Sequence, residues 1–118
     1  MRNLQLTLLA LLPAALAKTI DIDVGSGGLN FAPDTVTAAK GDVLAFHFYP
    51  PEHNVAQSTF DKPCVPSAGG IFSGTVEVKG TESDQTFNVV VNDTNPIWLY
   101  CGYEGHCNRG MAMVVNAP

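Results

Sequence analysis

Basic residues are scarce in this chain, and charges of either sign are few. Six Lys and Arg stand against eleven Asp and Glu in 118 residues, which gives a formal net charge of −5 and a charged fraction of 14%. A nucleic-acid-binding surface needs clustered Lys and Arg. No such cluster is present, so nucleic acid is not expected as a partner. The acidic residues are scattered, as on the surface of a soluble protein.

Long apolar segments are also scarce, and the one marked run lies at the start. Arg2 precedes LQLTLLALLPAALA, which ends in the small residues Ala15 and Ala17. These features predict a secretory signal peptide over residues 1–17, cleaved after Ala17. The alternative is an N-terminal helix of the folded domain. The run is short for a membrane span, and no other segment has the length, so no transmembrane span is expected.

The remaining residues, 18–118, suffice for one small domain, which we expect to be a monomer. The predicted leader places the domain outside the cell, where disulfides persist. No apolar tail for a lipid anchor follows Val115, so we expect a freely secreted protein or one associated with the cell wall. Asn92-Asp93-Thr94 is a sequon, which predicts a glycan on Asn92.

Helical periodicity is absent from residues 18–118, which Gly and Pro interrupt nearly everywhere. Short stretches instead alternate apolar and polar residues, as Ile20, Ile22 and Val24 do. Such stretches, separated by turn residues, predict an all-β fold, a Greek-key sandwich or barrel of about seven to eight strands. Trp98 and the phenylalanines are expected in its core. The predicted strands cover residues 18–24, 34–39, 42–48, 53–58, 75–79, 86–92, 97–101 and 111–117.

Sulfur and imidazole are rare, but they gather near the end of the chain. Of three Cys, three His and three Met, the segment YCGYEGHCNRGM holds two Cys, one His and one Met. Cys101, His106 and Met111 have the spacing C-x4-H-x4-M, with Cys101 ending one predicted strand and Met111 beginning the next. A loop that folds back between the strands could bring the three side chains to one point. Thiolate, imidazole and thioether together suit copper, and two His, one Cys and a distant Met form a blue-copper site.

The second histidine of such a site must be His47 or His53. His47 lies within the predicted strand 42–48, whose alternation points it toward solvent or the opposite layer. His53 follows a Pro-Pro turn, where a loop can hold a side chain at the end of a sandwich, so His53 is favoured. Met113 competes with Met111 because both can face the same side of the last strand. The spacing favours Met111, and Met113 is then a core residue.

With three cysteines, at least one has no internal disulfide partner. If Cys101 binds copper as a thiolate, Cys64 and Cys107 are left to pair. That bond would close a loop of about 44 residues and contribute roughly 4 kcal/mol in chain-entropy terms. The pairings Cys64–Cys101 and Cys101–Cys107 are also open, and either would consume the thiolate that the metal needs.

The chain resembles the cupredoxins, in particular the plant phytocyanins and similar secreted domains of fungi. The resemblance rests on HNV at 53–55, on C-x4-H-C-x3-M at 101–111, and on FAPDTVTAAKGDVLAFHF at 31–48, which is similar to the family's F-x-P-x-x-V-x-x-x-x-G-D strand pair. It implies one type 1 copper and one disulfide. The implied copper ligands are His53, Cys101, His106 and Met111, and the implied disulfide is Cys64–Cys107.

Asn54, which directly follows His53, is either a plain turn residue or a support for the site. In the second case its side chain ties the two ligand loops together, and its backbone N–H donates to the sulfur of Cys101. Such bonds fix the geometry of a ligand and tune the metal.

The resemblance implies a one-electron carrier that cycles between Cu(I) and Cu(II). Its electron port would be His106 with the surface of residues 103–105, and its redox partner, a protein or a small-molecule reductant, is not identified. Copper capture or buffering is an alternative, as is a cell-surface or matrix interaction domain. An enzyme is not expected, because no Ser-His-Asp set can be built without His53 or His106. A catalytic zinc site is disfavoured because a thioether is a poor zinc ligand.

Overall fold

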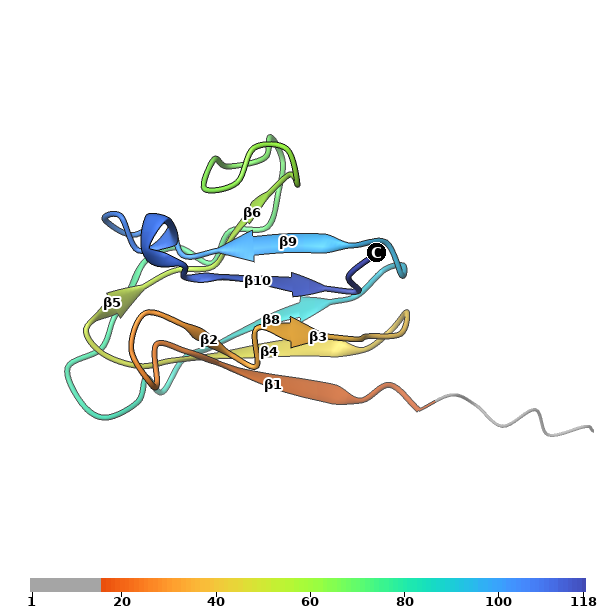
Figure 1. The fold of residues 1–118 in the computed structure, drawn as a ribbon. Helices are drawn as coiled ribbons and strands as arrows, with labels where there is room; N and C mark the ends of the chain where they lie inside the picture. Colours follow the sequence, from red (N-terminus) through yellow and green to blue (C-terminus); the bar gives the residue numbers. More distant parts are fainter. Residues whose placement is uncertain (1–15) are drawn as a thin grey trace, which may run out of the picture.

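The computed structural model describes residues 16–118, so the predicted signal peptide, apart from residues 16 and 17, lies outside the described residues. Within them no helix is long and apolar enough to cross a bilayer. The described chain is built from ten short strands and one turn of 3-10 helix, η1 (Figure 1). In chain order they are β1 Thr19–Val24, β2 Phe31–Ala32, β3 Thr35–Val36, β4 Val43–Phe48, β5 Glu52–His53, β6 Ala56–Ser58, β7 Val76–Glu77, β8 Thr86–Val90, β9 Ile97–Tyr100, η1 Cys107–Arg109 and β10 Ala112–Val115.

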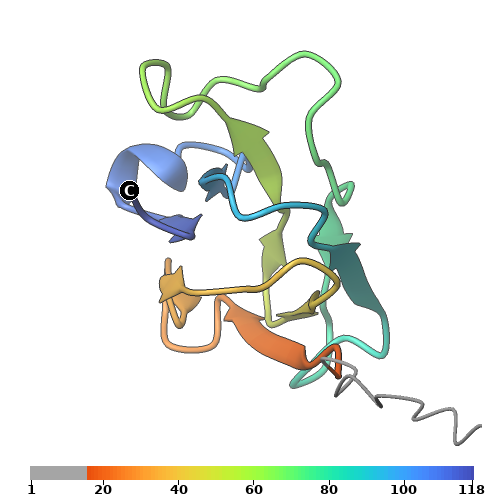
Figure 2. The ribbon, with the colours of Figure 1, turned by 90° about the vertical axis from the view of Figure 1, so that its right-hand side faces the viewer.

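The strands form two four-stranded sheets and a two-stranded ribbon. One sheet has the order β2-β1-β4-β8, the other has the order β3-β10-β9-β6, and β5 pairs with β7. β1 is parallel to β4 and β3 is parallel to β10, while the other neighbours are antiparallel. Figure 2 looks roughly along the strands and shows the sheets as two layers. The predicted all-β sandwich is confirmed, and no closed barrel forms in residues 16–118.

Several predicted strands are shorter than expected, and one is split. Residues 53–58 divide into the end of β5 and all of β6, with a break at Asn54 and Val55. The backbone N–H of Asn54 donates to the sulfur of Cys101, and that of Val55 donates to the hydroxyl of Ser73. Both donors are therefore used by side chains instead of by a neighbouring strand, which explains why the ladder stops there.

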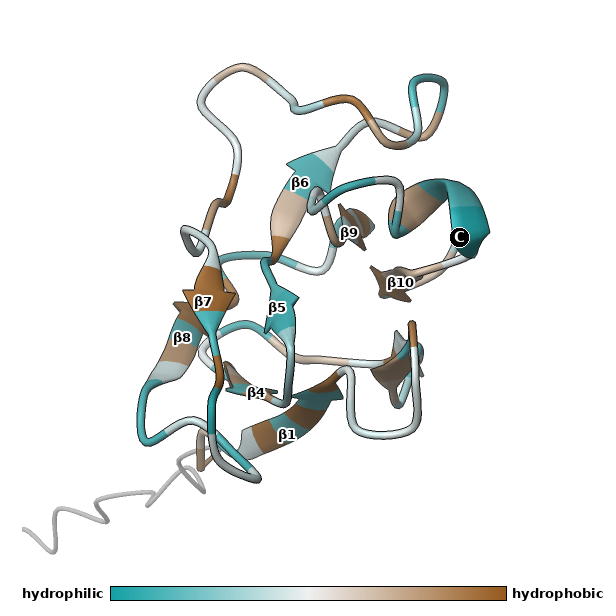
Figure 3. Cartoon of the chain, turned by 90° about the vertical axis from the view of Figure 1, so that its left-hand side faces the viewer, coloured by the Kyte–Doolittle hydropathy of each residue, from teal (hydrophilic) through white to brown (hydrophobic). Residues whose placement is uncertain are grey.

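The core lies between the two sheets, on the faces that the alternation of residues predicts. In β1, Ile22 is fully buried and Asp21 is exposed, and Figure 3 shows the matching bands of brown and teal along this strand. In β4, Phe46 and Phe48 are at most 1% exposed. His47 points outward, where its Nε2 lies 2.8 Å from the carboxylate of Asp21. Each fully buried Phe contributes about 1.5–3 kcal/mol through the hydrophobic effect.

The prediction that Trp98 and all phenylalanines form the core is wrong for three of these residues. Phe60 and Phe72 are 74% and 61% exposed. Trp98 is half-buried and packs on Phe60, with ring centroids 5.0 Å apart. Trp98 points outward because side chains alternate within β9 and the neighbouring Leu99 points into the core.

The two ends of the sandwich carry different parts of the chain. The end that we name the site end carries β5, η1 and the loop of residues 101–111 (Figure 1). The opposite end, the far end, carries the start of β1, the end of the chain after β10 and the turn of residues 91–96. Asn92 is exposed in this turn. Its glycosylation remains a prediction, and a glycan there would lie away from the site end.

Asp42 is a buried carboxylate that joins three segments at the far end. It is 3% exposed, and its oxygens accept hydrogen bonds from the backbone N–H groups of Ala39 (2.8 Å) and Lys18 (3.1 Å). Its carbonyl accepts from the N–H of Val91 (2.8 Å). The bond from Ala39, and after it the bond from Lys18, holds the pKa of Asp42 below its usual value.

This shift predicts a loss of stability in acid. Because the pKa of Asp42 is lowered in the folded state, its contribution is present above the unfolded pKa of about 3.9 and is lost as the pH falls through the folded pKa. We expect Asp42→Asn to reduce the free energy of unfolding at pH 7 and to flatten its decline in acid. Urea unfolding across this pH range measures both effects. Asp61→Asn, which removes an exposed carboxylate, is the control and should change neither.

Candidate metal centre

Two histidines and the free cysteine converge at the site end. The Sγ atom of Cys101 lies 3.5 Å from Nδ1 of His106 and 3.9 Å from Nδ1 of His53. All three candidate ligand atoms lie within 4.8 Å of one another. The three residues are 0%, 9% and 1% exposed, in the order Cys101, His106, His53. The sequence placed these residues in one site, and the structure brings them together.

The pairing of β9 with β10 brings Met111 beside Cys101. Ala112 is the partner of Tyr100 in the ladder, so Met111 and Cys101 are the next pair. The N–H of Cys101 donates to the carbonyl of Met111 (3.0 Å), and the N–H of Met111 donates to the carbonyl of His106 (3.1 Å). Met111 is fully buried in the same hydrophobic cluster as Cys101. The spacing C-x4-H-x4-M is thus that of a hairpin whose two ends meet across the ladder.

Met113 lies farther from the site than Met111. It pairs with Leu99 in the ladder, two residues along β10 from the level of Cys101. It is 5% exposed and belongs to the core cluster. The expectation that Met111 lies at the site and Met113 fills the core agrees with this register.

The loop between Cys101 and Met111 is shaped by turns. The N–H of His106 donates to the carbonyl of Tyr103 (2.9 Å), and η1 follows directly. The helix ends at Gly110, which has φ +98° and donates its N–H to the carbonyl of Cys107. This left-handed conformation costs glycine little and other residues more, so Gly110 lets the chain return to β10.

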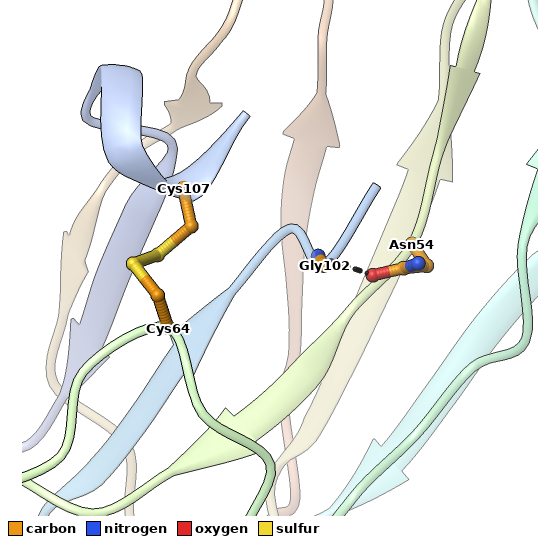
Figure 4. The surroundings of a disulfide bond; sticks show 4 residues. All are labelled: Asn54, Cys64, Gly102 and Cys107. Atoms are coloured by element: carbon orange, nitrogen blue, oxygen red, sulfur yellow. Dashed lines mark hydrogen bonds between the residues drawn. A yellow bond between two sulfur atoms is a disulfide. The ribbon is translucent and has the colours of Figure 1, made fainter. Parts of the chain in front are cut away.

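The disulfide joins Cys64 to Cys107, which is the pairing that the resemblance implied (Figure 4). It attaches the loop that contains Cys64 to η1, one residue after His106. With a sequence separation of 43 it restricts the unfolded chain by about 4 kcal/mol in chain-entropy terms. Cys101 remains the free, buried cysteine of residues 16–118.

Asn54 connects three segments around the sulfur of Cys101. Its backbone N–H donates to Sγ of Cys101 (3.4 Å). Its Oδ1 accepts from the N–H of Gly102 (2.6 Å), as Figure 4 shows, and its Nδ2 donates to the hydroxyl of Thr75 (3.2 Å). Asn54 is 4% exposed, and its bond to the sulfur of Cys101 is buried. The geometry is that of a support for the site and not of a plain turn residue.

The ring of His53 is oriented with Nδ1 toward the site. Its Nε2 lies 3.4 Å from the carbonyl oxygen of Pro50. A carbonyl can only accept, so Nε2 carries the hydrogen and Nδ1 offers its lone pair toward Cys101. Burial lowers the pKa of His53, and the neighbouring His106 lowers it further, while Pro50 acts in the opposite direction. The neutral imidazole is the form that binds a metal.

His106 is the more exposed of the two histidines, and Tyr103 covers part of it. The rings meet edge to face, with centroids 5.2 Å apart. Burial, together with a hydrogen bond to Glu52, raises the pKa of Tyr103, so this tyrosine is neutral at ordinary pH. The surface around His106 is therefore formed in part by an uncharged aromatic ring.

The donor set fits copper. The sulfur of Cys101 accepts the N–H of Asn54, which suits a thiolate, and two imidazole Nδ1 atoms face it. One thiolate and two imidazoles, with a buried thioether residue beside them, form the soft set that copper prefers. His47 lies outside this set, on the outer face of β4.

Two supporting residues were missed by the sequence reasoning. Thr75 contributes a hydroxyl to Asn54 from 21 residues away, and Pro50 contributes a carbonyl to His53. No residue spacing marks Thr75, and a backbone carbonyl leaves no mark in a sequence. Only the three-dimensional arrangement identifies them.

No protein-family model matches the chain, but individual proteins do. An "Extracellular serine-rich protein" of Arthroderma benhamiae is 41% identical over 114 residues, which are 96% of this chain and 44% of that protein. A "Probable GPI-anchored cupredoxin-1" of the same species is 40% identical, over 96% of this chain and 59% of that protein. The chain thus spans about half the length of these two relatives.

A smaller relative is matched over nearly its whole length. The "Basic blue protein" of Cucumis sativus is 30% identical over an alignment of 101 positions that covers 79% of this chain and 93% of that protein. Among solved structures, auracyanin B has a TM-score of 0.61 at 13% identity, over 86% of this chain and 90% of its own. The plastocyanin of Dryopteris crassirhizoma has a TM-score of 0.57 at 16% identity, over 81% and 97%. These two structures support the fold.

The position of Asn54 predicts a measurable loss of stability on truncation. Asn54→Ala removes two side-chain hydrogen bonds, to the N–H of Gly102 and to the hydroxyl of Thr75, which together contribute about 1–3 kcal/mol. We expect the free energy of unfolding of the metal-free protein to fall by this amount in urea titrations. Asn88→Ala, on the exposed face of β8, is the matched control and should be near neutral. Equal effects of the two substitutions would contradict the role given to Asn54.

Proposed function

Because the chain belongs to the cupredoxin family, with 30% identity over 93% of the Cucumis sativus basic blue protein, we propose that it is a type 1 copper protein that carries single electrons outside the cell. One observation carries the proposal. A buried thiol is kept out of the disulfide, and two imidazole Nδ1 atoms face it at 3.5 and 3.9 Å. A purely structural domain has no need of such a thiol.

This geometry supports a ligand assignment that is part of the proposal. Cys101, His53 and His106 would hold copper as the three strong ligands, and Met111 would supply a weaker thioether donor. Bound copper supplies a one-electron couple between Cu(I) and Cu(II). The protein's own part is to hold these four side chains in one arrangement that both oxidation states tolerate.

Each strong ligand is held by a contact outside the ligand set. The carbonyl of Pro50 orients His53, the N–H of Asn54 meets the sulfur of Cys101, and the disulfide fixes the residue after His106. Side chains held in this way change position little when the charge at the site changes, which lowers the cost of electron transfer. Supports of this kind also set metal affinity and potential.

Access to the site is uneven, which suggests where an electron enters. His53 is 1% exposed and Cys101 and Met111 are 0% exposed, whereas His106 is 9% exposed. His106, with the surface of residues 103–105, is therefore the proposed electron port. A redox protein or a small-molecule reductant would meet the domain there. The other three ligand side chains are at most 1% exposed, which favours a carrier over an enzyme.

The extracellular location is part of the proposal. It is supported by the predicted signal peptide, by the disulfide, and by relatives whose names contain "extracellular" and "GPI-anchored". A free and a wall-associated form are both compatible with this location. Copper buffering and a matrix interaction role are the competing functions. Neither of them requires rapid, reversible reduction of bound copper.

The first test is the visible spectrum of the mature protein titrated with Cu(II). We expect an intense blue band that saturates at one copper per chain, because the thiolate of Cys101 donates charge to the metal. Cys101→Ser should abolish the band, while Met113→Leu should leave it unchanged because Met113 is a core residue. A colourless wild-type protein would refute the copper proposal. A blue protein that reduces only slowly would favour buffering.

The second test is the reduction potential of Met111 variants. Met111→Gln should lower the potential, because an amide oxygen stabilises Cu(II) more than a thioether does. Met111→Leu should raise it, because the weak thioether donor would be lost. Met113→Leu is the matched control, a volume-conserving change that costs less than about 1.5 kcal/mol. Voltammetry on the three variants measures the shifts, and an unchanged potential in both Met111 variants would remove Met111 from the ligand set.

A further inference from the structure

The turn between β1 and β2 lies against the back of His53. Gly25 begins this turn, is buried and has φ +86°. A Cβ atom added at Gly25 would overlap Nε2 of His53 and would lie 2.5 Å from Cδ2 and 3.0 Å from Cε1 of the same ring. The Nε2 edge of the ring therefore fills the space that any side chain at position 25 would need.

We propose that Gly25 is a positioning residue for His53. Its backbone stops the imidazole from moving away from Cys101, and its missing side chain leaves room for the ring. This inference rests on the proposed function, because it concerns how a metal ligand is held, and it extends that function to a residue outside the ligand set.

The ring of His53 lies between two fixed neighbours. On one edge, Nδ1 faces the sulfur of Cys101 at 3.9 Å. On the opposite edge, Nε2 meets the carbonyl of Pro50 at 3.4 Å and the backbone of Gly25. The backbone of His53 is itself fixed by pairing with Val76 in the β5–β7 ribbon. Contacts on both sides of the imidazole of His53 therefore fix its distance from the sulfur of Cys101.

Hydrogen bonds hold the turn that begins at Gly25, so a clash at position 25 would displace the imidazole of His53 more easily than the turn. The N–H of Gly25 donates to the carbonyl of Asn30 (2.9 Å), which closes the turn. The N–H of Tyr49 donates to the carbonyl of Val24 (3.0 Å), which ties the end of β1 to the segment that leads to Pro50. Val24 is 0% exposed. A side chain at position 25 would therefore act mainly on His53.

The size of the effect follows from contact distances. Ordinary carbon contacts lie at about 3.5–4.0 Å, so a Cβ at position 25 requires a displacement of the ring of about 1 Å. Functional sites tolerate roughly 0.5 Å. We therefore expect Gly25→Ala to disturb the geometry of the ligand set and not only the stability of the turn.

A matched control lies in the same turn. Gly28 has φ +121°, is exposed, and an added Cβ there would meet nothing within 4 Å. Gly28→Ala therefore introduces backbone strain of the same kind without touching His53. A difference between the two substitutions isolates the contact with the imidazole from the cost of a positive φ.

The first experiment needs no metal. Urea unfolding of the copper-free protein compares Gly25→Ala and Gly28→Ala in the wild type and in a His53→Ala background. Gly25→Ala should lower the ratio of folded to unfolded protein at least about tenfold more when His53 is present, because in its absence the added methyl occupies the space of the ring. Gly28→Ala should cost the same in both backgrounds.

Folding failure does not obscure this result. If Gly25→Ala folds only in the His53→Ala background, the contact is supported. If Gly25→Ala has the same cost in both backgrounds, or folds in neither, the inference is overturned.

The second experiment uses Cu(II) as the probe. Gly28→Ala should retain the wild-type blue spectrum, whereas Gly25→Ala should shift the band and bind copper about 10–100-fold more weakly, the usual cost of losing a support of a ligand. An unchanged spectrum and affinity in Gly25→Ala would overturn the inference. A wild-type protein without a blue band would instead refute the proposed function, and the metal-free cycle would still report on Gly25 and His53.

Discussion

The bond between Cys64 and Cys107 is the constraint on which the site depends. It consumes two of the three thiols of the chain, so that the third, Cys101, stays free and buried. The same bond fixes the loop one residue after His106. A single covalent link thus decides which sulfur faces the imidazoles and holds one of those imidazoles in place. Either of the other pairings would have consumed the thiol of Cys101.

The two histidines of the site are held by different kinds of contact. His53 is enclosed by Pro50 and Gly25 and paired through β5, whereas His106 is carried by a loop and faces the surface with Tyr103. Between them lies Asn54, the residue after His53. Its side chain accepts a hydrogen bond from Gly102, in the loop that follows Cys101. One side of the site is therefore almost fully buried at His53, and the other reaches the surface at His106. The proposed electron port depends on this difference in exposure.

Much of the site could be predicted because its residues are close in sequence. Cys101, His106 and Met111 belong to one hairpin, so their spacing indicated that they could converge. Alternation pointed His47 toward solvent or the opposite layer, and the structure shows it pointing outward. The resemblance to the cupredoxins implied the disulfide pairing and supported the choice of His53 over His47.

Other features depend on contacts between distant segments and could not be predicted. The break after β5 arises because Asn54 donates to a sulfur 47 residues away. Trp98 lies outside the core because β9 directs Leu99 inward and Phe60 covers the opposite face. Both chain ends of the described domain and the turn with Asn92 lie at the far end (Figure 1). A tether joined to either end, or a sugar on that turn, would leave the site end facing outward. A domain held on a surface and a domain diffusing freely would therefore present the same histidine to an approaching molecule.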